Sequence, residues 1–284
     1  GDASVKITGG SVRRVYGAGS YDQAGTYTAG DIAVEIAEGV TIGERVGAAK
    51  VDAGNLTTGD VTITSAGDMT NLFGGAQVWY KGSSATHKSV TVNLTGEMSD
   101  VVYAAGQAMH GGWITVENGV TVNVDGGSIG SDGLMGGGFT RSDISETDTA
   151  GGITISGGTW INFSAGDISA IYGGTHTYSL SGQLEAVSNI TGGTHIAMTG
   201  GTAGNVQGGG YTAWGSKSVI DSTEVNISGG TVLYDVQGGS YVVGGGKDAA
   251  SGNSSTITGD ATVRISGDAV IQGNVIGGGW VNWA

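Results

Sequence analysis

Val225-Asn-Ile-Ser-Gly-Gly-Thr-Val232 is the stretch that decides the fold, and it closes four residues later with Val236-Gln-Gly-Gly239. Apolar, mostly β-branched residues alternate with polar ones, a Gly-Gly pair follows, and a second apolar position leads into a second pair of glycines. Period-two alternation of this kind predicts a short strand, and paired glycines predict a tight turn. A unit this small cannot bury its apolar side alone, so its repetition along the chain determines the architecture.

The same pattern recurs along the chain. Clear copies are Val5-Lys-Ile-Thr-Gly-Gly-Ser11, Ile196-Ala-Met-Thr-Gly-Gly-Thr202 and Val263-Arg-Ile-Ser-Gly267, and five weaker copies lie between and beside them. The first apolar residues of all copies are Val5, Val34, Val61, Val90, Val122, Ile161, Ile196, Val225 and Val263. Consecutive members of this series are 27 to 39 residues apart. Self-similarity at this period is typical of repeat architectures.

Composition and spacing favour one all-β architecture. The chain has 59 Gly in 284 residues and no Pro, and no window shows the apolar spacing of a helix. Proline would remove a hydrogen-bond donor from an interior strand, which fits its absence. A unit with two or three very short strands suits one coil of a solenoid better than the hairpins of a sandwich or the four-stranded blade of a propeller. We therefore expect a parallel β-solenoid of about nine coils, each of about 30 residues.

Differences in repeat length fall after the closing glycines. The longest insertions are Thr140–Gly152, Thr177–Asn189, Thr212–Thr223 and Lys247–Ala261. They are rich in Ser, Thr and Asp, so we expect them to project as loops from one edge. We interpret residues 1–284 as a single solenoid domain and as a fragment of a longer chain, because repeat sequence runs close to both ends.

The charge balance excludes several partners. Eleven basic residues stand against 25 acidic ones, a formal net charge of −14. No basic patch is available to neutralise phosphates, so we expect no nucleic-acid partner. No apolar run reaches the roughly 18 residues of a membrane span, so we expect no direct membrane insertion. The absence of Cys excludes disulfides and thiolate metal sites.

The repeats, with their Gly-Gly-Ser-Tyr241 and Gly-Gly-Gly-Trp280 closings, resemble the passenger domains of bacterial autotransporters and related surface adhesins. The resemblance covers nearly the whole chain. It implies a right-handed parallel β-helix displayed outside the bacterial cell, used for adhesion, aggregation or biofilm formation. It also implies anchoring at the outer membrane through a C-terminal region beyond this sequence.

Candidate binding residues follow the closing glycines. Five units carry an aromatic residue there, namely Tyr21, Phe139, Tyr211, Tyr241 and Trp280, and Trp214 lies close to Tyr211 in the sequence. Equivalent positions of a solenoid stack about 4.8 Å apart, so these side chains would form a ladder. If the ladder faces outward, it offers a platform for sugar rings. If it faces inward, it packs in the core or shields a corner, as aromatic stacks do. The sequence leaves both orientations open.

The acidic residues raise an enzymatic alternative. Some β-helix proteins cleave polysaccharides with paired carboxylates. The densest acidic group is Asp143, Glu146 and Asp148, which share one insertion and read as a solvated loop. Asp235 and Asp268 fall in different parts of their units, and we find no carboxylates at equivalent positions of adjacent coils. The histidines form no metal motif. We expect no catalytic residue, no metal and no cofactor.

These observations favour a non-enzymatic, extracellular surface protein of the adhesin type that contacts glycans, host matrix or neighbouring cells. A polysaccharide-active hydrolase or lyase is one alternative, and carboxylates in register on adjacent coils would favour it. A structural spacer or filament module that self-associates is the other, and inward-facing aromatic residues would favour that.

Overall fold

The computed structural model describes residues 1–142, 151–179, 186–244 and 253–282. Over these residues the chain forms β-strands and no helix, so there is no helix that is long and apolar enough to cross a membrane. Each strand pairs in parallel with strands of the neighbouring repeats. The predicted all-β class with parallel strands is therefore confirmed.

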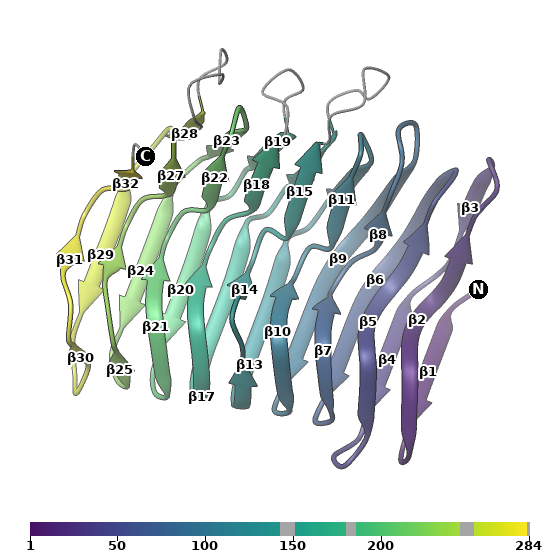
Figure 1. Cartoon of the computed structure of the whole chain (residues 1–284), viewed down its shortest axis with the longest axis horizontal. Helices are drawn as coiled ribbons and strands as arrows, with labels where there is room; N and C mark the ends of the chain where they lie inside the picture. Colours follow the sequence, from purple (N-terminus) through teal and green to yellow (C-terminus); the bar gives the residue numbers. More distant parts are fainter. Residues whose placement is uncertain (143–150, 180–185, 245–252, 283–284) are drawn as a thin grey trace.

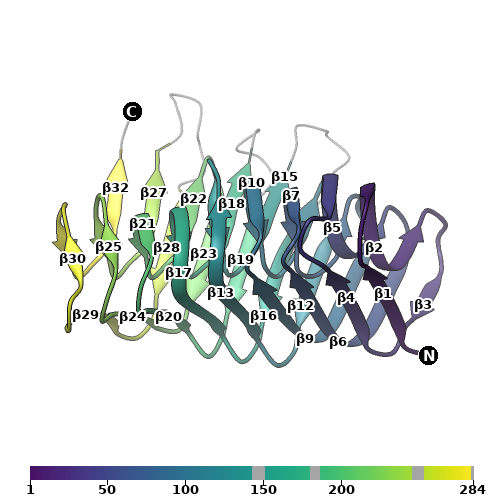
Figure 2. The ribbon, with the colours of Figure 1, turned by 90° about the horizontal axis from the view of Figure 1, so that it is seen from below.

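The pairings arrange the strands in four stacks that run along the long axis, from the purple N-terminal end to the yellow C-terminal end of Figure 1. Within one repeat the chain visits stack 1, stack 2, stack 3 and stack 4 in turn, and then re-enters stack 1 one strand further along. The N- and C-terminal ends consequently lie at opposite ends of the molecule (Figure 2).

Stack 1 contains the alternating segments that the sequence singles out. It is formed by β1 (Ala3–Ile7), β4 (Ile32–Ile36), the second halves of β6 (Asn55–Ser65) and β9 (Ser84–Leu94), the first halves of β13 (Val120–Ile129) and β17 (Thr159–Tyr172), β20 (Thr194–Met198), β24 (Thr223–Ile227) and β29 (Ala261–Ile265).

Stack 2 follows the first glycine turn. It is formed by the first parts of β2 (Ser11–Tyr21) and β5 (Thr41–Val51), β7 (Asp68–Phe73), β10 (Glu97–Tyr103), the end of β13 with β14 (Gly133–Met135), the second half of β17, β21 (Thr202–Gln207), β25 (Thr231–Val232) with β26 (Val236–Gln237), and β30 (Val270–Ile271) with β31 (Val275–Ile276).

Stacks 3 and 4 complete each repeat. Stack 3 is formed by the ends of β2 and β5, β8 (Gln77–Val78), β11 (Gln107–Met109), β15 (Phe139–Ser142), β18 (His176–Ser179), β22 (Tyr211–Ala213), β27 (Tyr241–Val243) and β32 (Trp280–Asn282). Stack 4 is formed by β3 (Thr26–Thr28), the first halves of β6 and β9, β12 (Trp113–Val116), β16 (Gly151–Ile155), β19 (Ala186–Ile190), β23 (Lys217–Ile220) and β28 (Ser254–Ile257).

The register of stack 1 matches the repeats, with a shift in two copies. One column of paired residues contains Val5, Val34, Ile63, Val92, Val122, Ile161, Ile196, Val225 and Val263. Val61 and Val90, which the sequence proposes for this column, lie two residues before its true members, Ile63 and Val92. A shift by two keeps a side chain on the same face of a strand, so both valines are still buried.

The core lies between the stacks and is continuous along the molecule. Inward-facing apolar side chains from all four stacks form a single cluster from Val15 to Val236. Ile63, Val92 and Val225 at its centre are completely buried. Burying apolar area contributes roughly 25 cal/mol per Å², so this cluster is the main stabilising term of the fold.

The loop prediction is wrong for parts of the insertions, because Ser and Thr also face the interior. The range Thr212–Thr223 contains strand β23, and Thr140, Thr177 and Thr212 at the starts of three ranges are completely buried in stack 3. Thr177 Oγ1 donates to the carbonyl of Tyr211 at 3.3 Å, and Ser188 Oγ donates to Thr175 Oγ1 at 2.7 Å. The hydroxyls of Thr140 and Thr212 are buried without a hydrogen-bond partner. Short hydroxyl side chains are thus buried in this fold both with and without hydrogen bonds, so polar composition alone does not identify a loop.

Candidate functional site

A groove on the outer surface lies where stack 2 meets stack 3. In the later repeats the chain turns between these stacks through glycines such as Gly208–Gly210. Val206 and Thr212 on either side of this turn are completely buried, so the alternation of a strand turns Gln207 and Tyr211 next to them toward the outer side, where Gln207 lines the groove. The C-terminal part of the groove has a volume of about 370 Å³. Its lining is formed by Tyr172, Asn205, Gln207, Asp235, Gln237, Tyr241, Trp280 and Asn282.

Tyr241 and Trp280 of the groove lining belong to an aromatic column on stack 3. Its members pair in register and are Phe139, His176, Tyr211, Tyr241 and Trp280. Neighbouring ring centroids are 5.0 Å apart for Phe139 and His176, 4.6 Å for His176 and Tyr211, and 5.5 Å for Tyr211 and Tyr241. The first four side chains are half-buried, whereas Trp280 is 45% exposed. The ladder therefore faces outward.

Two of the predicted binding residues lie outside the aromatic column. Tyr21 pairs with Val51 on the other face of its strand, one residue out of phase with the column. Its ring packs on Tyr27 at 4.5 Å, and its hydroxyl donates to the carbonyl of Ala18. Trp214 packs on Tyr178 at 4.6 Å, beside the column but not in the lining of the groove. The predicted place of Tyr21 in the ladder is thus wrong, whereas Trp214 lies beside the ladder, where the sequence placed it.

Sequence reasoning missed His176, which occupies the place between Phe139 and Tyr211. The glycine spacing in the sequence identifies this place, because Gly173-Gly-Thr-His176 has the same spacing as Gly238-Gly-Ser-Tyr241. A histidine ring is planar and stacks as the other aromatic rings do, but a search restricted to Phe, Tyr and Trp passes over it.

The opposite wall carries two amides that the sequence reasoning also missed. Gln207 and Gln237 pair in register on stack 2, and both are only 4% exposed. The Oε1 atom of each is buried and has no hydrogen-bond donor. Both residues occupy the same position of a recurring Val-Gln-Gly-Gly motif, at the closing glycines. The repetition was visible in the sequence, but the proximity of the two amides to the aromatic column depends on the turn between the stacks.

Burial keeps the titratable rings of the groove uncharged. It raises the pKa of Tyr172 to about 12, with smaller contributions from Tyr211, Tyr241 and Asp132, and it also raises the pKa of Tyr211. Burial lowers the pKa of His176 to about 4. The carboxylate of Asp235 accepts hydrogen bonds from the backbone N–H and the side-chain amide of Asn274, at 2.8 and 3.0 Å. The lining thus combines aromatic surface, hydroxyls, amides and one carboxylate.

The N-terminal part of the groove is filled by its own side chains. Phe73, Tyr103 and Met135 pair in register on stack 2 and form a separate buried cluster. Ring centroids of Tyr103 and Phe139 are 5.1 Å apart, so the stack 2 cluster packs directly on the start of the aromatic column. The space that remains for a ligand is therefore at the C-terminal part.

The expectation of no carboxylates at equivalent positions of adjacent coils is wrong. Asp2, Asp31 and Asp60 stand in register, and the backbone N–H groups of Asp31 and Asp60 donate to the carboxylate one repeat before them, at 3.1 and 2.9 Å. A second group of carboxylates lies on stack 2. Asp132 donates its backbone N–H to the carbonyl of Asp100 at 3.4 Å, one strand along stack 2. Burial and the charge of Asp100 raise the pKa of Asp132. Asp235 and Asp268 lie in different turns, as expected, and the acidic group Asp143, Glu146 and Asp148 lies outside the described residues. Within the described part of the chain, no three His, Cys, Asp or Glu residues are grouped to hold a metal ion.

Comparisons of the chain with protein-family models, with curated proteins and with solved structures find no match.

Proposed function

We propose that this chain is a right-handed parallel β-solenoid of the bacterial surface-adhesin type, which binds glycans in its external groove and does not cleave them. The parallel register from repeat to repeat supports the solenoid, and the general preference of parallel crossovers supports its right hand. The resemblance of the repeats to autotransporter passenger domains supports a place at the cell surface.

The observation that carries the glycan proposal is the outward-facing aromatic column beside buried amides. Ligand sites combine apolar and aromatic surface with a few placed polar groups. Sugars suit this lining, since their C–H faces pack on aromatic rings and their hydroxyls pair with amides and phenols. Trp280 is the residue that we expect to contribute most, because an indole offers the largest ring face among the aromatic residues of the lining.

The test is binding of the purified chain to an immobilised glycan panel, with the masses of the soluble products recorded. For a glycan that is retained intact, we expect Trp280→Ala to weaken binding at least tenfold, about 1.4 kcal/mol, as truncation of a central aromatic contact does.

Trp160→Ala is the matched control for this substitution. Trp160 is 47% exposed and stacks on His195 at 3.8 Å, on the outer face of stack 1 and away from the groove. We expect this substitution to leave the affinity for the glycan within twofold of that of the unsubstituted chain. Equal losses in the two variants would contradict the groove as the site. A panel without any retained or shortened glycan would contradict glycan binding and favour a spacer module.

A polysaccharide-active enzyme is a second candidate, and the proximity of Asp100 and Asp132 favours it. Glycosidases use two carboxyl groups, of which the general acid has a raised pKa. The pKa of Asp132 is raised in this way, and its carboxylate lies near Tyr103 and Tyr172. Shortened glycans in the same experiment, abolished by Asp132→Asn, would establish this function in place of the adhesin proposal.

A further inference from the structure

We infer that the groove takes a neutral, hydroxyl-rich glycan and discriminates against acidic ones. This inference rests on the proposed function and adds the substrate class. It depends on the C-terminal part of the groove, whose lining is given above.

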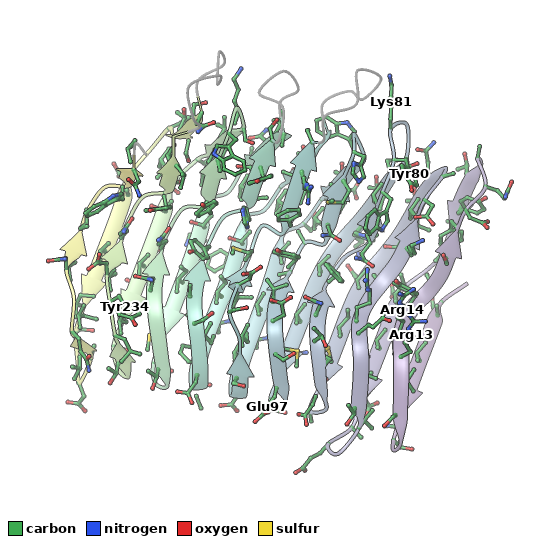
Figure 3. All side chains as sticks on the ribbon, viewed as in Figure 1. Arg13, Arg14, Tyr80, Lys81, Glu97 and Tyr234 are labelled. Carbon is green, nitrogen blue, oxygen red and sulfur yellow. The ribbon has the colours of Figure 1, made fainter. Side chains whose placement is uncertain are left out.

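The charges of the lining disfavour an anionic ligand. Its eight residues include Asp235 and neither Lys nor Arg. Figure 3 labels Arg13 and Arg14 near the N-terminal end, where both donate to Glu44, far along the molecule from the C-terminal part of the groove. An acidic glycan would place its carboxylates or sulfates beside Asp235 with no cation in the lining to pair with them, and partly desolvated like charges repel strongly.

The hydrogen-bonding capacity of the lining points to a donor-rich ligand. Gln207 and Gln237 each have a buried Oε1 atom without a donor, and such unpaired acceptors are uncommon in folded proteins. The terminal torsion of glutamine is soft, so a small rotation turns either oxygen toward the groove. Sugar hydroxyls supply donors, whereas ionised carboxylates and sulfates supply only acceptors.

The N-terminal part of the same groove provides an internal comparison. Gln77 Oε1 accepts from Tyr16 Oη at 3.3 Å and from Arg45 Nη1 at 3.4 Å. Gln77 Nε2 donates to Gln107 Oε1 at 2.8 Å. Amides there are paired by the protein itself, whereas Gln207 and Gln237 lack donors in the part of the groove that is open. The protein supplies donors to Gln77 but none to Gln207 and Gln237, so the structure assigns the missing donors to a ligand.

The phenols and the repeat spacing agree with this chemistry. Tyr241 Oη accepts a hydrogen bond from Asn282 Nδ2 at 3.2 Å, which leaves its O–H to donate to a ligand. Gln207 and Gln237 are separated by one strand spacing, about 4.8 Å, which is close to the advance of one ring in an extended 1,4-linked chain. The volume of about 370 Å³ admits a short segment of such a chain.

The test compares neutral and acidic oligosaccharides of equal length on the full 284-residue chain. Neutral xylo-, cello- and manno-oligosaccharides are titrated beside oligogalacturonate and a sulfated heparin oligosaccharide, with binding followed by calorimetry. We expect at least one neutral chain to bind at least tenfold more tightly than either acidic one. Tighter binding of an acidic chain would overturn the inference of neutrality while leaving glycan binding in place. Binding of neither set would overturn the proposed function itself.

Substitution of the amide tests the acceptor argument separately. We expect Gln237→Leu, which keeps the apolar stem and removes the acceptor, to weaken binding of the neutral chain at least fivefold. Gln272→Leu is the matched control, because Gln272 is exposed and does not line the groove. Circular dichroism confirms that both variants fold. Binding that is unchanged by Gln237→Leu would show that the orphaned oxygen is not a ligand contact, and would overturn the acceptor argument.

Discussion

Replacing Gly230 with alanine should lower the free energy of unfolding by roughly 3 kcal/mol, through backbone strain and overpacking together. Gly230 has a φ of +83°, a conformation that L-residues adopt only with strain. An added Cβ would lie 2.6 Å from the carbonyl oxygen of Gly201, in the turn before β21 of the neighbouring repeat. That same oxygen accepts the N–H of Thr231, so the methyl group would push apart a pairing of stack 2.

Gly10→Ala isolates the contribution of close approach. Gly10 occupies the same place of the Ser/Thr-Gly-Gly-Ser/Thr turn as Gly230, and its φ is +88°, but nothing lies within 4 Å of its added Cβ. Only the backbone strain remains, so this variant should lose about 1 kcal/mol. Urea unfolding followed by circular dichroism measures both variants. Equal destabilisation would show that contact between repeats does not require glycine at this turn.

Acid should destabilise the protein steeply between pH 6.5 and 4, because of His87. This side chain is completely buried, and burial lowers its pKa to about 4. Nε2 accepts the N–H of Ala76 at 3.0 Å, and Nδ1 lies 2.8 Å from Thr58 Oγ1. Nε2 must therefore be unprotonated, and the ring is neutral with its proton on Nδ1. A second proton would break the bond to Ala76 and bury a charge.

The sign of the pH dependence follows from that shift. The unfolded chain protonates His87 near pH 6.5, whereas the folded chain does so only near pH 4, so the unfolded state binds more protons between these values. The stabilisation is complete above pH 6.5 and is lost as the pH falls toward 4. A pKa difference of this size corresponds to about 3 kcal/mol. His176 acts in the same direction, because burial lowers its pKa to about 4 as well.

His87→Gln separates this effect from the titration of carboxylates. Glutamine keeps an amide oxygen and an amide N–H for the two partners, but it does not titrate. We expect the variant to be less stable than the wild type at pH 7 and to lose distinctly less stability between pH 7 and 4. Urea midpoints measured across this range give the two slopes, and the carboxylates contribute equally to both. Identical slopes would contradict the role assigned to His87.

The sequence predicted the strands of stack 1 better than those of stacks 3 and 4. Val225 and Ile227 alternate with polar residues and precede glycines, so the strand they form is visible from local pattern alone. Stack 3 strands such as Tyr211–Ala213 are three residues long, too short for a period to be seen. Thr212 and Ser218 are buried in these strands, but Ser and Thr are also common in loops, so their presence does not distinguish a strand from a loop.

The residues of the groove could be predicted only in part from the sequence. The spacing between glycines and aromatic residues indicated that Phe139, Tyr211, Tyr241 and Trp280 share a position, and the structure places them in one column. Tyr21 was assigned one residue out of phase, and alternation in a strand makes such an error turn the side chain to the other face. Gln207 and Gln237 belong to stack 2, so no distance along the sequence indicates that they face the aromatic column.

The sequence by itself determined the all-β class, the repeat and the parallel pairing, because each depends on residues close together in the chain: alternating β-branched side chains, glycine turns and a period near 30 residues. Only the tertiary structure decided which way the aromatic column faces and what lies opposite it. That outcome depends on the angle at which stacks 2 and 3 meet around the glycine turns. The turn angle is set by close approach between strands that lie one repeat apart, which local patterns do not record.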